Sequence, residues 1–202
     1  MSTYMGARQS FRRQTAAHYA YMIIARLKTR AVEVFKMASL DTGKEMIIQY
    51  LKENFPAGSV ALDVGACDGK YYDLLGDHFT MDAVEIFAPN VETHRLREKY
   101  RYVFVGDIMD YNYHKGDYDV AIFGDVIEHM TIAEAQHVLE KARKKCKEVI
   151  VAVPYMWPQG ALYGNQHERH LQPDLTPELF EKRYPGFTVM YKQYNYGYYR
   201  KS

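Results

Sequence analysis

The chain has only two cysteines, no long apolar run and no excess of charge of either sign. Cys67 and Cys146 cannot build a disulfide framework, and they lack the spacing of paired metal ligands, so a reducing compartment such as the cytoplasm is expected. The longest apolar runs, 20–25 and 149–153, are far shorter than the ~20 residues of a membrane-spanning helix. We therefore expect no membrane partner.

Charge is balanced, with 26 Lys and Arg against 25 Asp and Glu, which leaves a net charge of +1. A protein without a broad positive field has no general attraction for nucleic acid, so nucleic acid is not the expected partner. The hydrophobic fraction of 48% and the charged fraction of 25% are typical of a globular protein and exclude disordered and low-complexity classes. The 202 residues are enough for one ordinary domain.

The N-terminal segment differs from the rest, because no acidic residue precedes Glu33 while several arginines do. This pattern resembles a transit peptide or a basic arm. The helical spacing of Ala20, Ile24 and Leu27 instead favours an amphipathic helix with the arginines on its solvated face. We predict a helical segment over residues 1–40, with a role as a lid among the options, and the main domain over residues 41–202.

From residue 41 onward, helical and strand-like segments alternate, which is typical of an α/β protein with a parallel sheet. Near-continuous apolar runs such as 149–153 suit strands that are covered on both faces. The pattern predicts a doubly wound, mostly parallel sheet that ends in an antiparallel strand pair. The predicted strands are 59–64, 81–86, 102–105, 118–123, 148–153, 187–191 and 194–199; the predicted helices are one capped by Thr42 and Glu45, one around 71–75, one after Pro89, one over 131–145 and one from Thr176.

Three carboxylates occupy equivalent places at the ends of successive predicted strands: Asp63, Glu85 and Asp107. The carboxyl ends of parallel strands share one crevice, so these acids should converge there. Asp63 is followed by the glycine-containing turn 65–69, which allows a close approach of backbone to ligand. Glu85 lies twenty residues after Gly65, the separation at which an acid can hold ribose hydroxyls. The sequence therefore predicts a nucleotide-type site.

The turn departs from a dinucleotide cradle, because Cys67 and Lys70 replace the second and third glycines of that motif. Three acids would also repel a diphosphate, whereas they would attract a ligand that carries a sulfonium and an ammonium group. S-adenosylmethionine fits both observations. A nucleotide-binding oxidoreductase remains an alternative.

Segment 60–69 resembles the first motif of the class I S-adenosylmethionine-dependent methyltransferases, although Cys67 replaces the commoner glycine. Segments 106–108 and 118–129 resemble the adenine-framing and fourth-strand motifs of the small-molecule branch of that family. The likeness covers residues 59–155 well and 174–199 loosely. It implies a Rossmann-like fold, S-adenosylmethionine as the methyl donor, and a cofactor site formed by Asp63, Gly65, Ala66, Cys67, Gly69, Glu85, Ile86, Asp107, Ile108 and Asp125.

The leading hypothesis is an enzyme that moves a methyl group to an oxygen or nitrogen of a small-molecule acceptor such as a sugar or another metabolite. Such an in-line displacement depends mainly on alignment of the reactants. The alternative from another class is an RNA-directed methyltransferase or RNA-binding module that uses the basic N-terminal arm. The sequence gives no oligomeric state.

The loop 155–174 is long for a compact domain, which favours a functional role. It contains His167, Glu168 and His170, and we predict that one of the two histidines is the general base, with Glu168 orienting it or the substrate. A plain surface loop is the alternative. A zinc site at the two histidines lacks further ligands nearby, so no metal is expected. His129 is the next candidate base, although Glu128 and His129 could simply open a helix.

Overall fold

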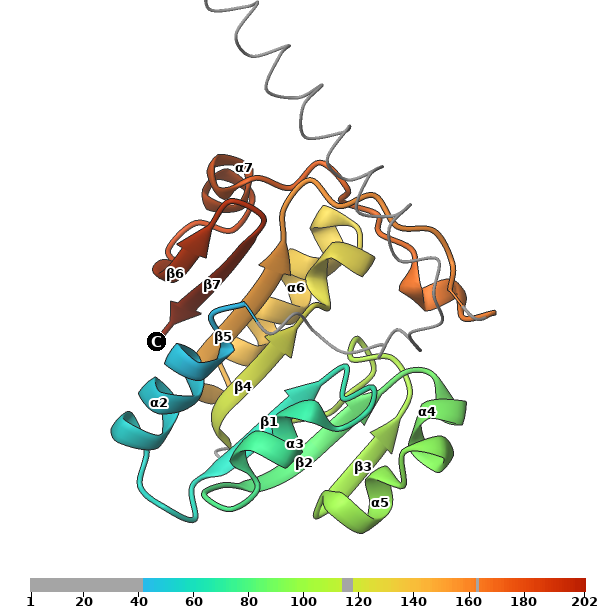
Figure 1. Ribbon diagram of the computed structural model, residues 1–202, viewed down its shortest axis with the longest axis vertical. Helices are drawn as coiled ribbons and strands as arrows, with labels where there is room; N and C mark the ends of the chain where they lie inside the picture. The colour runs from blue at the N-terminus through green and yellow to red at the C-terminus, as the bar shows by residue number, and fades with distance from the viewer. Residues whose placement is uncertain (1–41, 114–117, 163) are drawn as a thin grey trace, which may run out of the picture. The chain divides into compact units, whose positions relative to one another are not determined.

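A computed structural model describes residues 42–113, 118–162 and 164–202; the predicted N-terminal segment 1–40 lies outside these residues. Within them, seven strands form one sheet in the order β3-β2-β1-β4-β5-β7-β6 (Figure 1). The first five are parallel, and β7 runs antiparallel to both β5 and β6. The predicted mostly parallel sheet with a terminal antiparallel pair is confirmed.

Most element bounds agree with the predicted ranges to within one or two residues. The strands are β1 (Val60–Val64), β2 (Thr80–Glu85), β3 (Tyr102–Val105), β4 (Tyr118–Gly124), β5 (Cys146–Pro154), β6 (Thr188–Gln193) and β7 (Tyr196–Lys201). The helices are α2 (Lys44–Asn54), α3 (Lys70–Leu75), α4 (Ala88–Thr93), α5 (Leu96–Lys99), α6 (Ile132–Arg143) and α7 (Pro177–Arg183), with the short 3₁₀ turns η1 (Ile127–His129) and η2 (Gln166–Glu168).

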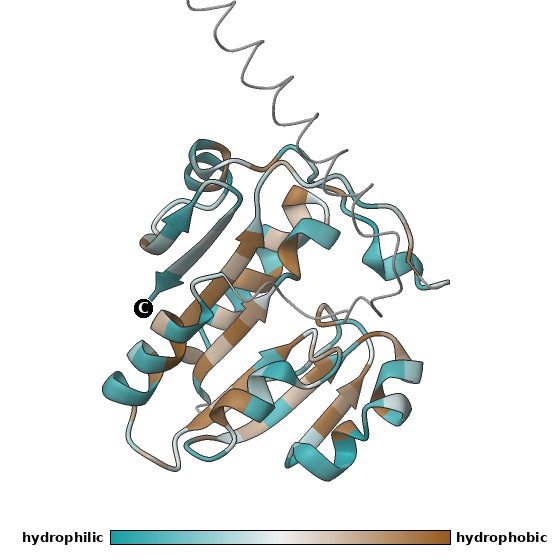
Figure 2. Ribbon diagram, viewed as in Figure 1, coloured by the Kyte–Doolittle hydropathy of each residue, from teal (hydrophilic) through white to brown (hydrophobic). Residues whose placement is uncertain are grey.

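The sheet is covered on both faces, and much of its central strands is accordingly brown in Figure 2. Apolar residues of α2 to α5 join one core cluster, and those of α6 and α7 join the other. The run Val149–Val153 in β5 is fully buried, as a strand between two layers requires. This arrangement leaves the carboxyl edge of the parallel strands as the place where turns and loops gather.

Two helix predictions need correction. Thr42 and Glu45 form no capping box, because α2 begins after Gly43, which has a left-handed backbone (φ 73°) and makes no side-chain cap. The helix after Pro89 is two helices, since Arg95 adopts φ 51° between α4 and α5. By contrast, Thr131 and Glu134 do form the predicted capping box of α6.

The terminal strand pair turns at residues 194–195, and Gly197 lies inside β7 rather than in the turn. A side chain at Gly197 would overlap the Tyr155 hydroxyl, so glycine is required for β7 to pack there. This strand brings Tyr196 to the end of β4. In the described part of the chain, no helix is long and apolar enough to cross a membrane.

Candidate active site

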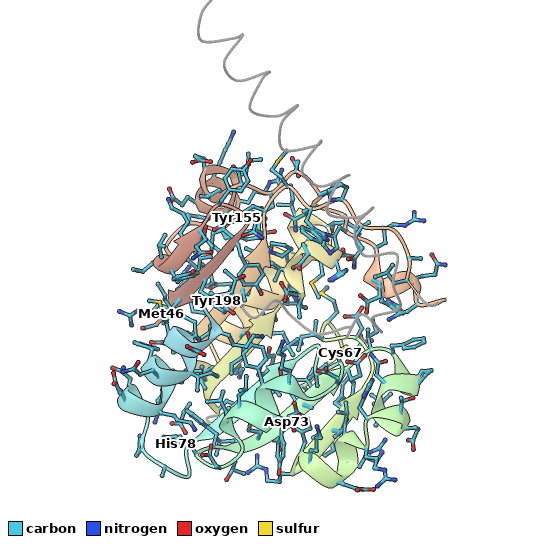
Figure 3. All side chains as sticks on the ribbon, in the orientation of Figure 1. Met46, Cys67, Asp73, His78, Tyr155 and Tyr198 are labelled. Carbon is cyan, nitrogen blue, oxygen red and sulfur yellow. The ribbon has the colours of Figure 1, made fainter. Side chains whose placement is uncertain are left out.

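The turn after β1 is built to bring backbone close to a ligand. Gly65 adopts φ 73° and its N–H donates to the Val84 carbonyl of β2 at 2.8 Å, while the Gly69 N–H closes the turn on Ala66 at 2.7 Å. Cys67 lies at the top of this turn with φ 49° (Figure 3). The turn therefore meets the ends of β1 and β2 at the carboxyl edge of the sheet.

Gly65 also sets how closely the turn approaches the segment after β4. A Cβ at Gly65 would lie 2.7 Å from Val126 Cγ2, whereas one at Gly58, which has a similar φ of 86°, would meet nothing within 4 Å. We expect Gly65→Ala to lower the free energy of unfolding by about 2–4 kcal/mol, against about 1 kcal/mol for Gly58→Ala, since the latter adds only backbone strain. Urea unfolding of both variants checks this; equal losses would contradict the close approach.

Glu85, the last residue of β2, is 4% exposed and joins the turn to the next helix. Its Oε2 accepts the Cys67 N–H and its Oε1 accepts the Phe87 N–H, both at 2.8 Å, with Asn90 Nδ2 at 3.4 Å from Oε1. Burial raises the pKa of this carboxyl. Each carboxylate oxygen can accept more than one hydrogen bond, so Glu85 can still receive hydroxyl donors.

The other two strand-end acids differ from Glu85. Asp63 is 1% exposed, accepts a hydrogen bond from the Tyr100 hydroxyl, and lies in the core below the turn; burial raises its pKa to about 7. The nearby Glu85 charge raises this pKa too, so these two acids do converge. Asp107 accepts the Met109 N–H at 2.9 Å in a local turn.

The apolar members of the predicted cofactor site are placed unequally. Ile86 is 37% exposed beside Glu85, whereas Ile108 and Ala66 are each 4% exposed and belong to the core. Of these three residues, only Ile86 therefore presents an open apolar surface at the edge of the sheet.

Asp125 follows β4 with φ 55°, and the Tyr196 hydroxyl of β7 lies 2.8 Å from each of its carboxylate oxygens. The antiparallel end of the sheet thus fixes an acid at the end of a central parallel strand. Val126, which contacts Gly65, is the next residue. The turn after β1 and the segment after β4 therefore lie side by side at the carboxyl edge of the sheet.

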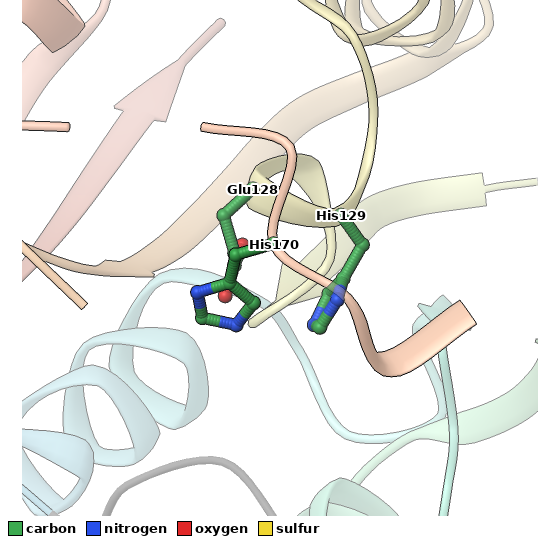
Figure 4. A group of neighbouring side chains, drawn as sticks. All are labelled: Glu128, His129 and His170. Carbon is green, nitrogen blue, oxygen red and sulfur yellow. The ribbon is translucent and has the colours of Figure 1, made fainter. Parts of the chain in front are cut away.

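Two side chains of the segment after Asp125, Glu128 and His129, form a cluster with His170 from the long loop (Figure 4). The two imidazole rings meet edge to face with centroids 4.6 Å apart. Glu128 is 1% exposed, and burial together with the Asp125 charge raises its pKa well above the usual range. Burial lowers the pKa of His129 to about 4 and also lowers that of His170. Burial thus favours the neutral form of both imidazoles.

Hydrogen bonds from the backbone and from one side chain hold the long loop against η1. The N–H groups of Leu171 and Gln172 donate to the Glu128 carbonyl at 2.8 and 3.1 Å, and Gln172 Nε2 donates to the Ile127 carbonyl at 2.8 Å. The loop is thus tied at His170, which it brings beside His129. These contacts place the loop at the carboxyl edge of the parallel strands, beside the segment that follows β4.

The other predicted loop residues occupy different positions. His167 is exposed on η2 and is not a member of the cluster. Glu168 is partly buried, receives Asn165 Nδ2 at 3.3 Å, and has its pKa raised by burial and by the Glu85 charge. The structure therefore places Glu168 toward the cofactor turn and leaves His167 outside the cluster that contains His170.

The sequence ranked His129 behind the two loop histidines as a candidate base and assigned Glu128 no role of its own. The adjacent Glu-His pair at the end of the fourth-strand motif was the available signal. The pair forms a cluster only with His170, and His170 lies beside it only because the loop folds back against η1.

Comparison with solved structures identifies the class of protein to which this fold belongs. The structure of an S-adenosylmethionine-dependent methyltransferase from Clostridium acetobutylicum matches with a TM-score of 0.60 and 12% identity, over 92% of this chain and 98% of that chain. The chain therefore has the class I methyltransferase fold. Within that class, it belongs to the family described as methionine biosynthesis protein MetW, whose model matches residues 45–158.

Two further structures support the fold. The 1,6-didemethyltoxoflavin-N1-methyltransferase of Burkholderia thailandensis, with S-adenosylhomocysteine bound, has a TM-score of 0.58 and 18% identity over 95% of this chain and 90% of that one. The magnesium protoporphyrin IX methyltransferase of Synechocystis, with S-adenosylmethionine bound, has a TM-score of 0.57 and 15% identity over 91% of this chain and 91% of that one. Another match, from Nostoc punctiforme, is longer, and the chain spans 55% of it. No curated protein matches the sequence.

Proposed function

We propose that the chain binds S-adenosylmethionine and transfers its methyl group to an oxygen or nitrogen of a small molecule, such as a sugar or another metabolite. The observation that carries this is Glu85, a buried acid at the second strand end bonded to the N–H of Cys67 in the glycine turn. The matched Burkholderia and Synechocystis enzymes, with S-adenosylhomocysteine or S-adenosylmethionine bound, support it. The family's description as a methionine biosynthesis protein favours a metabolite as acceptor.

The residues present fit such a cofactor, which supplies an activated methyl group. The backbone of turn 65–69 can approach a ligand closely, because Gly65 carries no side chain. A side chain at this position would collide with Val126. Glu85 would receive the ribose hydroxyls, exposed Ile86 and the 106–108 turn would border the adenine, and Asp125 would face the methionine end. Asp63 would support the turn from below through Tyr100.

The acceptor would meet the cluster of Glu128, His129 and His170, because Glu128 and His129 lie just after Asp125 and the long loop places His170 beside them. The acceptor lone pair attacks the methyl carbon as the carbon–sulfur bond breaks; the bonding electrons pass to sulfur, and the acceptor loses a proton. Most of the acceleration comes from holding the reactants in line. Of the two loop histidines, His170 would contact the acceptor, because it belongs to the cluster whereas His167 is exposed outside it.

Calorimetric titration of the full chain tests the cofactor assignment. We expect saturable binding of S-adenosylhomocysteine at one site per chain, and a rise in thermal stability that grows with ligand concentration. Matched titrations with a nicotinamide dinucleotide and with a short RNA should show no comparable binding. Stabilisation by the nicotinamide cofactor alone would overturn the proposal in favour of an oxidoreductase.

A further inference from the structure

The Glu128 carboxylate is a buried acid without a hydrogen-bond partner. Its side chain is 1% exposed, and within the described ranges neither oxygen receives a hydrogen bond from another residue. Leaving such a group unpaired destabilises the folded state, and more so if the group is charged. Folded proteins leave few such groups, and a bound ion is one of the partners that accounts for them. Glu128 therefore points to a ligand.

The two neighbouring histidines are held in the form that binds metals. His129 Nδ1 lies 3.3 Å from the Arg169 carbonyl and His170 Nδ1 lies 2.6 Å from the Trp157 carbonyl. A carbonyl oxygen only accepts hydrogen bonds, so each Nδ1 carries the proton and each Nε2 keeps its lone pair. Metal-binding histidines have this arrangement, in which a carbonyl or carboxylate fixes the second nitrogen.

We propose that Glu128, His129 and His170 bind one divalent transition-metal ion of the Zn²⁺ type. One ligand atom from each residue lies within 4.8 Å of the others. Ligands in a tetrahedral zinc site lie roughly 3.4 Å apart, so small side-chain rotations complete the contacts. Two imidazoles and one carboxylate form a known catalytic set that keeps an open position. The sequence-based expectation of no metal rested on His167 and His170 alone.

The surrounding charge favours a cation. The carboxylates of Asp125 and Glu168 both lie close enough to Glu128 for their negative charges to act on it. A concentration of acids around a partly enclosed group attracts positive ions. Nitrogen ligands favour Zn²⁺ over Mg²⁺, which prefers an all-oxygen shell.

The open position of this ion would hold the acceptor oxygen, a role that rests on the proposed methyl transfer. A bound divalent ion lowers the pKa of a coordinated hydroxyl and fixes its direction. The hydroxyl proton then leaves to solvent, and the oxygen attacks the methyl carbon. The binding of the ion itself does not depend on that function.

Calorimetric titrations of the full, untagged chain with ZnCl₂ and, separately, MgCl₂ test the site. We expect one Zn²⁺ per chain and much weaker Mg²⁺ binding. Because loss of an outer partner already costs 10–100-fold in metal affinity, Glu128→Gln and His170→Gln should each weaken Zn²⁺ binding by about 100-fold or more. His167→Gln, from the same loop but outside the cluster, is the matched control and should bind as the wild type does.

Each variant is also titrated with S-adenosylhomocysteine, which should bind unchanged and which reports folding. If Glu128→Gln does not fold, His129→Gln and His170→Gln decide the matter. The site would be overturned if Zn²⁺ binding survived all the cluster substitutions, or if His167→Gln lost Zn²⁺ binding to the same extent. Tighter binding of Mg²⁺ than of Zn²⁺ would overturn it too. If wild-type protein binds Zn²⁺ but not S-adenosylhomocysteine, the proposed function fails and the metal site stands; the reverse result rejects the metal site alone.

Discussion

Replacing His170 by alanine is expected to lower the rate of methyl transfer by ~10²–10⁴-fold while the affinity for S-adenosylhomocysteine stays unchanged. His170 is 9% exposed, its ring lies against His129, and the Trp157 carbonyl orients it. The substitution removes a group on the acceptor side, so it should affect chemistry and not cofactor binding. Formation of S-adenosylhomocysteine in the presence of the acceptor gives the rate.

His167→Ala is the matched control for this prediction. His167 lies three residues earlier and is exposed, so its removal should leave turnover close to that of the wild type. Wild-type turnover in His170→Ala across pH 6 to 9, or an equal loss in His167→Ala, would show that the acceptor does not meet the cluster.

Replacing Glu85 by alanine should weaken S-adenosylhomocysteine binding by roughly 2–4 kcal/mol, which is about 30–1000-fold, because two charge-assisted hydrogen bonds to the ribose are lost. The same change leaves the N–H groups of Cys67 and Phe87 without their acceptor, so some loss of stability is also expected. Calorimetry at a temperature where the variant is folded measures the affinity.

A ligand without the ribose hydroxyls separates these two effects. The wild type should bind the 2′,3′-dideoxy analogue of S-adenosylhomocysteine about 30–1000-fold more weakly than S-adenosylhomocysteine itself, whereas Glu85→Ala should bind both ligands almost equally. Glu92→Ala, at an exposed position of α4, should behave as the wild type does. The same preference in Glu85→Ala and the wild type would remove Glu85 from the ribose site.

The sheet was predictable because its strands are covered on both faces and therefore carry uninterrupted apolar runs such as 149–153. Helix starts were less predictable where backbone conformation decided them. Thr42 offered a good capping pattern, but Gly43 begins α2 in a left-handed conformation. Arg95 divides the helix after Pro89 in the same way, and nothing in its residue type signals this.

Some residues of the candidate site were also predictable from local sequence features, and others were not. Glu85 was predictable, since its place at a strand end and its separation from Gly65 are both local features. The burial of Asp63 against Tyr100 depends on a side chain from another element. The pairing of His129 with His170 depends on loop hydrogen bonds to η1, which no local pattern encodes.

The most direct test of the account is a crystal structure of the full chain with S-adenosylhomocysteine bound. We expect the ribose hydroxyls on the Glu85 carboxylate, the backbone of turn 65–69 against the ligand, and the sulfur directed toward Glu128, His129 and His170. A ligand bound elsewhere on the chain would contradict it. So would a ligand whose sulfur points away from that cluster while Glu85 stays bonded only to Cys67, Phe87 and Asn90.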